Sequence, residues 1–130
     1  MTSPLLLTAL VAVGGALGAV SRYWLSLASA YLFGSAFPYG TLIVNLLGSL
    51  AIGALYAVLQ SGLVATAPVR ALIGVGFLGA LTTFSTFSMD TLALLQNGHL
   101  LQAALNVLLN VLLCLSLVWL GHSWVLSRLG

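Results

Sequence analysis

Three glycines precede five hydroxyl side chains within one apolar stretch of the chain, Gly74-Val75-Gly76-Phe77-Leu78-Gly79-Ala80-Leu81-Thr82-Thr83-Phe84-Ser85-Thr86-Phe87-Ser88. Glycine and β-branched threonine are both poor helix formers, so we expect a helix that breaks and restarts here. A break frees backbone carbonyls that can hold a cation and amides that can face an anion. The alternative is a continuous helix whose hydroxyls bond back to its own carbonyls.

The composition outside this stretch excludes water as the main solvent of the chain. Of 130 residues, 62% are hydrophobic and 3% are charged, and the mean hydropathy is +1.22. Soluble domains carry about 25% charged residues. The charged side chains are Arg22, Arg70, Asp90 and Arg128. They indicate an integral membrane protein, and they form no cluster of cations that would bind a nucleic acid.

Glycine, proline and polar residues divide the chain into four apolar runs. A membrane-spanning helix needs about 20 residues, so the length allows four spans with short loops. In lipid, such runs must be helices to satisfy their own backbone groups. The sequence therefore predicts an all-α membrane protein with a single four-helix domain over residues 1–130. Its expected spans are about 5–33, 41–60, 70–95 and 100–126.

The arginines leave the orientation open. Arg70 and Arg128 fall on one side of the membrane and Arg22 toward the other, which is a very weak positive-inside bias. Either other features fix the orientation, or the chain inserts both ways up and pairs antiparallel. Arg22 itself either snorkels to the interface or lies at a water-filled vestibule.

The ionisable side chains do not predict an enzyme. Asp90 lacks a second carboxylate for acid–base chemistry, and it is expected to cap a helix or pair with an arginine. His99 and His122 sit at opposite ends of the fourth span, too far apart to share a metal within one chain. No nucleophile–base pair is identifiable.

Two spans carry polar residues at a four-residue spacing, which places each set on one side of its helix. The second span has Thr41, Asn45 and Ser49, and the fourth has Gln102, Asn106, Asn110 and Cys114. Such residues can hold packed helices together by hydrogen bonds. Three asparagines exceed what packing needs, so the amides favour a polar pathway instead.

These residues resemble the Fluc/CrcB family of microbial fluoride channels over essentially the whole chain. The matching motifs are Gly14-Gly15-Ala16-Leu17-Gly18-Ala19-Val20-Ser21-Arg22-Tyr23, Gly40-Thr41-Leu42-Ile43-Val44-Asn45-Leu46-Leu47-Gly48 and the Gly76–Ser88 run. The third motif is specific, whereas the first alone would be weak. The family's fourth helix usually carries a tyrosine and serines, and Asn106, Asn110 and Cys114 replace them here.

The resemblance implies an antiparallel, dual-topology homodimer in the inner (plasma) membrane, with two fluoride pores and a central structural sodium ion. Such a channel would passively export fluoride from the cytoplasm and relieve its toxicity. By position, the pore asparagine is Asn45 and the pore phenylalanines are Phe84 and Phe87. Gly79 and Thr82 correspond to the carbonyl donors to sodium. The remaining expected site residues are the polar side chains Thr41, Thr83, Ser85, Thr86, Asn106 and Asn110, with Arg22 at the vestibule.

Elementary chemistry is consistent with this expectation. Fluoride is small and strongly hydrated, so a pore has to replace the hydrogen bonds of water with donors that release the ion again. Asparagine amides and hydroxyls are neutral donors, and the electropositive edges of Phe84 and Phe87 could face an anion. Without the motif, ordinary core packing is the favoured interpretation of both rings.

Two rival functions remain. A proton-coupled exporter of the small multidrug resistance type has a similar length, but it relies on a glutamate in its first helix and this chain has none. A non-transporting membrane assembly subunit would explain the Gly14-x-x-x-Gly18 packing pattern, but it would not explain the amide stripes or the hydroxyl cluster.

Overall fold

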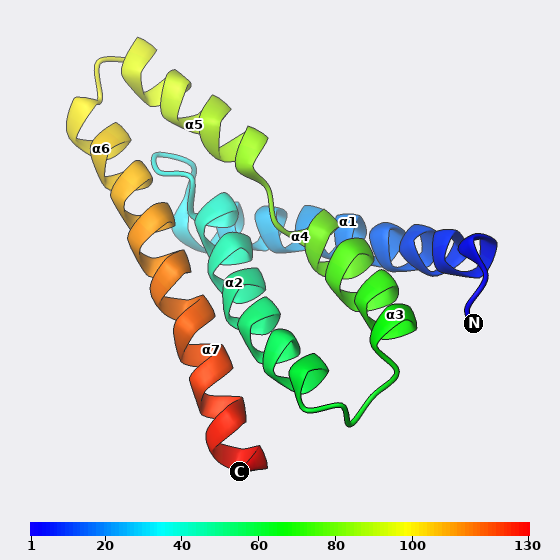
Figure 1. Ribbon diagram of the computed structural model, residues 1–130. Helices are drawn as coiled ribbons and strands as arrows, with labels where there is room; N and C mark the ends of the chain where they lie inside the picture. Colours follow the sequence, from blue (N-terminus) through cyan, green and yellow to red (C-terminus); the bar gives the residue numbers. More distant parts are fainter.

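The computed structural model describes residues 1–130 and is entirely helical (Figure 1). Four helices are long and apolar enough to cross a membrane: α1 (Pro4–Phe33), α2 (Tyr39–Gln60), a third span over Thr66–Gln96 and a fourth over Leu100–Leu129. The third span begins at Thr66 rather than at the predicted Arg70. Pro68 lies in its first turn, where a helix tolerates proline because the N–H that proline lacks would have no partner there.

The third span is broken, as the glycine–threonine cluster predicts. It consists of α3 (Thr66–Val69), the π-helical segment η1 (Arg70–Leu78), α4 (Gly79–Leu81) and α5 (Phe84–Gln96). Between α4 and α5 the backbone is extended, with φ −83° and ψ 155° at Thr82 and φ −151° and ψ 116° at Thr83. Figure 1 shows α5 leaving the path of α4 after this link. A continuous third helix is therefore excluded.

The fourth span is continuous but widens in its middle. It consists of α6 (Leu100–Leu108), the π-helical segment η2 (Leu109–Leu113) and α7 (Cys114–Leu129). α7 packs along α2 in the most extensive helix contact of the molecule. Glycines bring the two backbones together, since a Cβ on Gly53 would overlap the Val118 carbonyl and one on Gly121 would overlap the Leu50 carbonyl.

α1 packs on the third span through the Gly-x-x-x-Gly pattern predicted to mark close packing. A Cβ on Gly14 would overlap the Leu72 carbonyl oxygen, and one on Gly18 would overlap that of Phe77. Both contacts are with the backbone of η1. The two glycine interfaces, α1 with η1 and α2 with α7, position the break between them.

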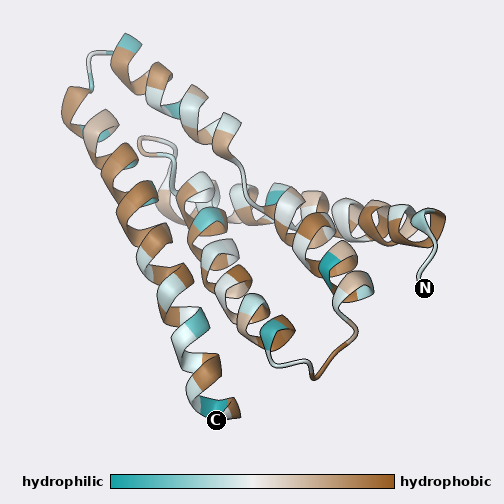
Figure 2. Ribbon diagram, viewed as in Figure 1, coloured by the Kyte–Doolittle hydropathy of each residue, from teal (hydrophilic) through white to brown (hydrophobic).

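Most of the surface is apolar and exposed. Only 20 of 130 residues are buried, and hydrophobic residues, drawn brown in Figure 2, recur along all of the helices. The accessible surface is 8020 Å², whereas a compact soluble monomer of 13.4 kDa would expose about 6,500 Å². This open, apolar shape is that of a multi-pass membrane protein whose helices face lipid or another protein chain.

Candidate functional site

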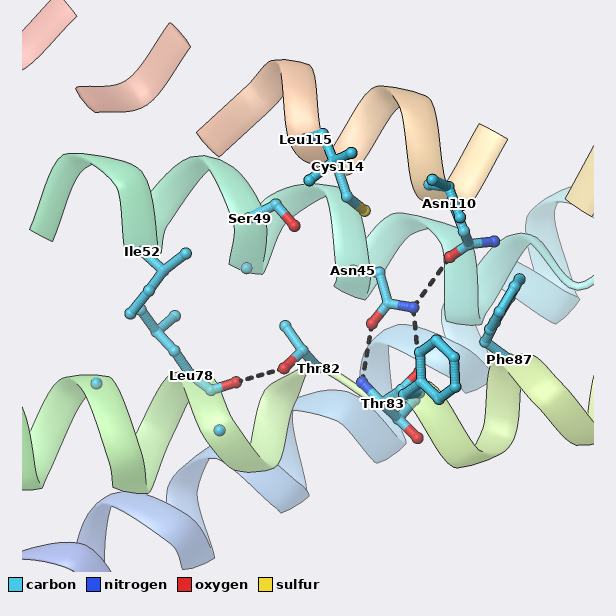
Figure 3. A pocket seen from close by; sticks show the side chains of 15 residues that line it. Asn45, Ser49, Ile52, Leu78, Thr82, Thr83, Phe87, Asn110, Cys114 and Leu115 are labelled. Atoms are coloured by element: carbon cyan, nitrogen blue, oxygen red, sulfur yellow. Dashed lines mark hydrogen bonds between the residues drawn. The ribbon is translucent and has the colours of Figure 1, made fainter. Parts of the chain in front are cut away.

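A cavity of about 460 Å³ lies where α2, the helix break and the fourth span meet (Figure 3). Its wall combines apolar side chains with amides, hydroxyls and one thiol. Of the predicted site residues, the wall contains Asn45, Gly79, Thr82, Thr83, Phe84, Phe87 and Asn110. The cavity therefore brings together residues from three of the four spans.

Asn45 braces the broken backbone. Its Oδ1 accepts the Thr83 N–H at 2.8 Å, and its Nδ2 donates to the Thr83 carbonyl at 3.1 Å. The same Nδ2 donates to Oδ1 of Asn110 on η2 at 3.0 Å. Asn45 thus satisfies both backbone groups of the extended residue Thr83, which no helix partner can reach. Figure 3 shows these bonds side by side.

The amide contacts continue along the fourth span. Nδ2 of Asn110 donates to the carbonyl of Asn106 at 2.9 Å and to its Oδ1 at 3.1 Å. Nδ2 of Asn106 donates to the Thr91 hydroxyl on α5 at 3.0 Å. These bonds make Asn106 part of the same polar network. Its side chain is fully buried, however, and it does not line the cavity.

The hydroxyl cluster begins α5. Thr83 is the N-cap, and its Oγ1 accepts the Thr86 N–H at 3.1 Å, the usual use of threonine at this position. The same hydroxyl donates to Oγ1 of Thr86 at 3.0 Å and lies 3.4 Å from Oγ of Ser85. Ser85 is exposed and lines neither this cavity nor the second one described below.

Phe84 and Phe87 stand next to each other with ring centroids 5.3 Å apart and ring planes inclined by 56°. Their environments differ greatly. Phe84 is 76% exposed, whereas Phe87 is 7% exposed. Ordinary core packing therefore accounts for the position of Phe87 but not for that of Phe84.

The carbonyl side of the break also faces the cavity. In a continuous α-helix the Thr83 N–H would bond to the Gly79 carbonyl. It donates to Asn45 instead, which frees the Gly79 carbonyl from that bond. The Thr82 hydroxyl bonds within its own span and donates to the Leu78 carbonyl, four residues earlier, at 2.9 Å.

Thr41 and Arg22 lie apart from this cavity. The Thr41 hydroxyl donates to Oδ2 of Asp90 at 2.7 Å, in a second cavity of about 500 Å³ that Thr86 and His99 also line. Asp90 therefore bonds a hydroxyl and not an arginine, contrary to one of the predicted roles. Arg22 is half-buried on α1 and lines neither cavity.

The sequence interpretation missed Thr91 and the partner of Asp90. Thr91 has the same four-residue spacing that identified the amide stripes, because Thr83, Phe87 and Thr91 follow one side of α5. His122 also has a partner that spacing alone does not indicate, since its Nε2 lies 2.8 Å from Oε1 of Gln60 on α2.

Comparison with known proteins places the chain in a family. Residues 9–122 match the family model described as "CrcB-like protein, Camphor Resistance (CrcB)". A protein of Pseudoalteromonas translucida (strain TAC 125), named "Fluoride-specific ion channel FluC", is 54% identical over 92% of this chain and 99% of its own length. Proteins of the same name from Shewanella frigidimarina (strain NCIMB 400) and Shewanella sp. (strain ANA-3) are 58% and 56% identical over 92% of this chain, covering 95% and 96% of their own lengths. The extent of these matches shows that the chain belongs to the CrcB family.

Proposed function

We propose that this protein is a fluoride-selective ion channel that passively exports fluoride from the cytoplasm and so relieves fluoride toxicity. The observation that carries the proposal is the similarity to proteins named fluoride-specific ion channels, at 54% and 58% identity over 92% of the chain. We place the channel in the inner (plasma) membrane, across which cytoplasmic fluoride has to leave.

The geometry of the site supports an anion route without a proton-coupled step. The cavity wall offers amide and hydroxyl groups and the rings of Phe84 and Phe87, none of which carries a charge. Neutral donors can replace the water around an anion and still release it, whereas a buried cation would hold it. Asn45, Phe84 and Phe87 are the proposed pore residues.

The two rival functions are not favoured. The chain contains no glutamate, on which a small multidrug-type exporter depends, and its single carboxylate is bonded to Thr41. An assembly subunit would need the glycine interfaces but would have no use for a polar cavity at a broken helix.

Flux through purified protein tests the function directly. The protein is reconstituted into liposomes loaded with potassium fluoride, and release is followed with a fluoride electrode after valinomycin is added. We expect rapid fluoride release, with chloride release no faster than from protein-free liposomes. Equal rates for chloride and fluoride would contradict the proposed selectivity, and no release of either ion would contradict a channel.

We propose further that two copies associate antiparallel, with dual topology. Two observations support a second copy. Phe84 is 76% exposed beside extended backbone, and non-helical backbone at membrane depth has to be covered by protein or a cavity. The accessible surface also exceeds that of a compact chain by roughly 1,500 Å², which is the order of area that a stable protein interface buries.

We propose that a structural sodium ion joins the two copies through the Gly79 and Thr82 carbonyls. The donor set fits a hard cation, because such ions prefer oxygen ligands and the diverted Thr83 N–H leaves the Gly79 carbonyl available. The ion would contribute positive charge that holds the facing carbonyls together. Sodium should raise the dissociation temperature of the purified dimer relative to N-methylglucamine, as a ligand of the folded state does. The same temperature in both would contradict the site.

A further inference from the structure

The polarity of the amide network is fixed by the backbone. The Thr83 N–H can only donate, so the Asn45 atom that faces it at 2.8 Å must be Oδ1. Nδ2 of Asn45 then points to Oδ1 of Asn110. At the next step the Asn106 carbonyl can only accept, which requires Nδ2 of Asn110 at that position. Two backbone groups therefore set the orientation of every amide between them.

The resulting chain of donors runs in one direction and closes on α5. Asn45 donates to Asn110, Asn110 to Asn106, and Asn106 to the Thr91 hydroxyl. The Thr91 hydroxyl donates in turn to the Phe87 carbonyl at 2.8 Å. We call the four side chains Asn45, Asn110, Asn106 and Thr91 the amide relay. It starts at the helix break, passes through α2 and the fourth span, and ends on the backbone of Phe87.

We propose that Thr91 and Asn106 are positioning residues for the fluoride route, acting through Asn110 on Asn45 without touching the ion. This inference rests on the proposed function. It assigns a role to Thr91 and changes that of Asn106, which the sequence placed among the pore residues.

Burial and hydrogen bonding separate these two residues from the cavity wall. Asn106 has no exposed surface, and neither it nor Thr91 lines the cavity that Asn45 and Asn110 share. Oδ1 and the carbonyl of Asn106 both accept from Asn110. If Thr91 is removed, the buried Asn106 amide loses an acceptor that water cannot replace, so we expect it to rotate and to withdraw its Oδ1 from Asn110. Asn110 then keeps only the backbone carbonyl of Asn106 as its acceptor and is held less firmly against Asn45.

Side-chain amide spectra test the relay without requiring transport. The chain has four asparagines, Asn45, Asn97, Asn106 and Asn110, so selective ¹⁵N-asparagine labelling gives four side-chain NH₂ signals. Thr91→Val should shift the signals of all three relay asparagines and leave that of Asn97, which is exposed in a turn. Thr91→Ser keeps a hydroxyl at this position, so the asparagine signals of that variant should lie at their wild-type positions.

Thr8→Val is the matched control. Thr8 also bonds its hydroxyl to the carbonyl four residues earlier, at 2.8 Å from Pro4, but it is exposed on α1 and outside the relay. It should leave the asparagine signals unchanged. If Thr91→Val does not fold, Asn106→Asp replaces it, because that change keeps the shape of the side chain and removes the donor to Thr91. An Asn45 signal that does not move in either variant overturns the proposal.

Flux supplies the second test. Thr91→Val should slow fluoride efflux about five- to tenfold, as expected when one buried hydrogen bond is lost at a positioning residue. In an Asn110→Ala background the same change should have no further effect, because the link to Asn45 is already cut. If Thr91→Val slowed efflux by the same factor in the Asn110→Ala background as in the wild-type protein, the relay would be overturned. Wild-type protein that moves no fluoride would refute the proposed function, while the amide signals would still decide the relay.

Discussion

Replacing Asn45 by aspartate changes the donors of the site and keeps its shape. The new carboxylate still accepts the Thr83 N–H but can no longer donate to the Thr83 carbonyl or to Asn110. If ionised, it repels an anion about 4 Å away by roughly 4 kcal/mol at an effective dielectric near 20. We expect Asn45→Asp to slow fluoride efflux about 1,000-fold. Asn97→Asp makes the same change in an exposed turn and should keep the wild-type rate.

The pore role and the packing role of the two phenylalanines can be tested separately, because Phe84 is exposed and Phe87 is buried. Isoleucine keeps apolar bulk but removes the electropositive ring edge. We expect both Phe84→Ile and Phe87→Ile to lower fluoride efflux. Only Phe87→Ile, at a 7% exposed position, should also destabilise the protein, by about 1 kcal/mol. Efflux and thermal unfolding measured on the same preparations check this, and unchanged efflux in both variants would remove the rings from the pore.

At the residue scale, spacing predicted which side chains share a face but not which atoms they bond. The four-residue spacing of Asn106 and Asn110 indicated one polar side of the fourth span, and the structure has them in contact. It did not indicate that Asn106 bonds Thr91, because that pairing depends on the direction that α5 takes after the break. Contacts across helices follow from their crossing geometry, which no single segment encodes.

The interface between α1 and η1 gives a test at the scale of a helix pair. Gly18→Ala would place a methyl group against the Phe77 carbonyl and should destabilise the protein by about 1–3 kcal/mol. Gly15→Ala is the matched control, because the nearest atom to its Cβ would be the Gly76 carbonyl oxygen at 4.0 Å. It should be neutral or stabilising, since alanine is the better helix former. Thermal unfolding in detergent measures both, and equal stabilities would contradict close packing at Gly18.

At the scale of elements, the break was predictable and the widened turns were not. Glycine and threonine weaken a helix wherever they cluster, so residues 74–88 indicated a break, which occurs at Thr82 and Thr83. The π-helical segment η2 contains leucines, one valine and one asparagine, and η1 includes Gly74 and Gly76, but neither composition distinguishes a π-helix from an α-helix. η1 packs closely on α1, and such contacts between helices are not recorded in a local sequence pattern.

At the scale of the whole molecule, dual topology predicts a complementation experiment. Added lysines in the loop at residues 61–67 should bias insertion toward one orientation, because cationic loops stay in the cytoplasm. The biased protein alone should lose activity, and a second copy biased the opposite way should restore it. Fluoride sensitivity of cells that express one or both copies is the measurement.

Labelling checks the orientation itself. Cys114 is the sole cysteine, so a single cysteine placed in the 61–67 loop of a Cys114→Ser protein reports on which side that loop lies. Wild-type topology should give partial labelling by a membrane-impermeant reagent added from outside. Labelling of all molecules, or of none, would show one orientation and contradict the antiparallel pair.

The glycine interfaces also have a consequence for biogenesis. α1 packs on the third span and α2 on the fourth, so each close contact joins two segments that cross the bilayer in the same direction. No span finds its main partner in the next one to be synthesised. Gly14 and Gly18 have to wait for residues 72–77, and Gly53 has to wait for Val118 near the end of the chain. A nascent chain that stalls after two spans therefore leaves the glycine faces of both α1 and α2 without their partners.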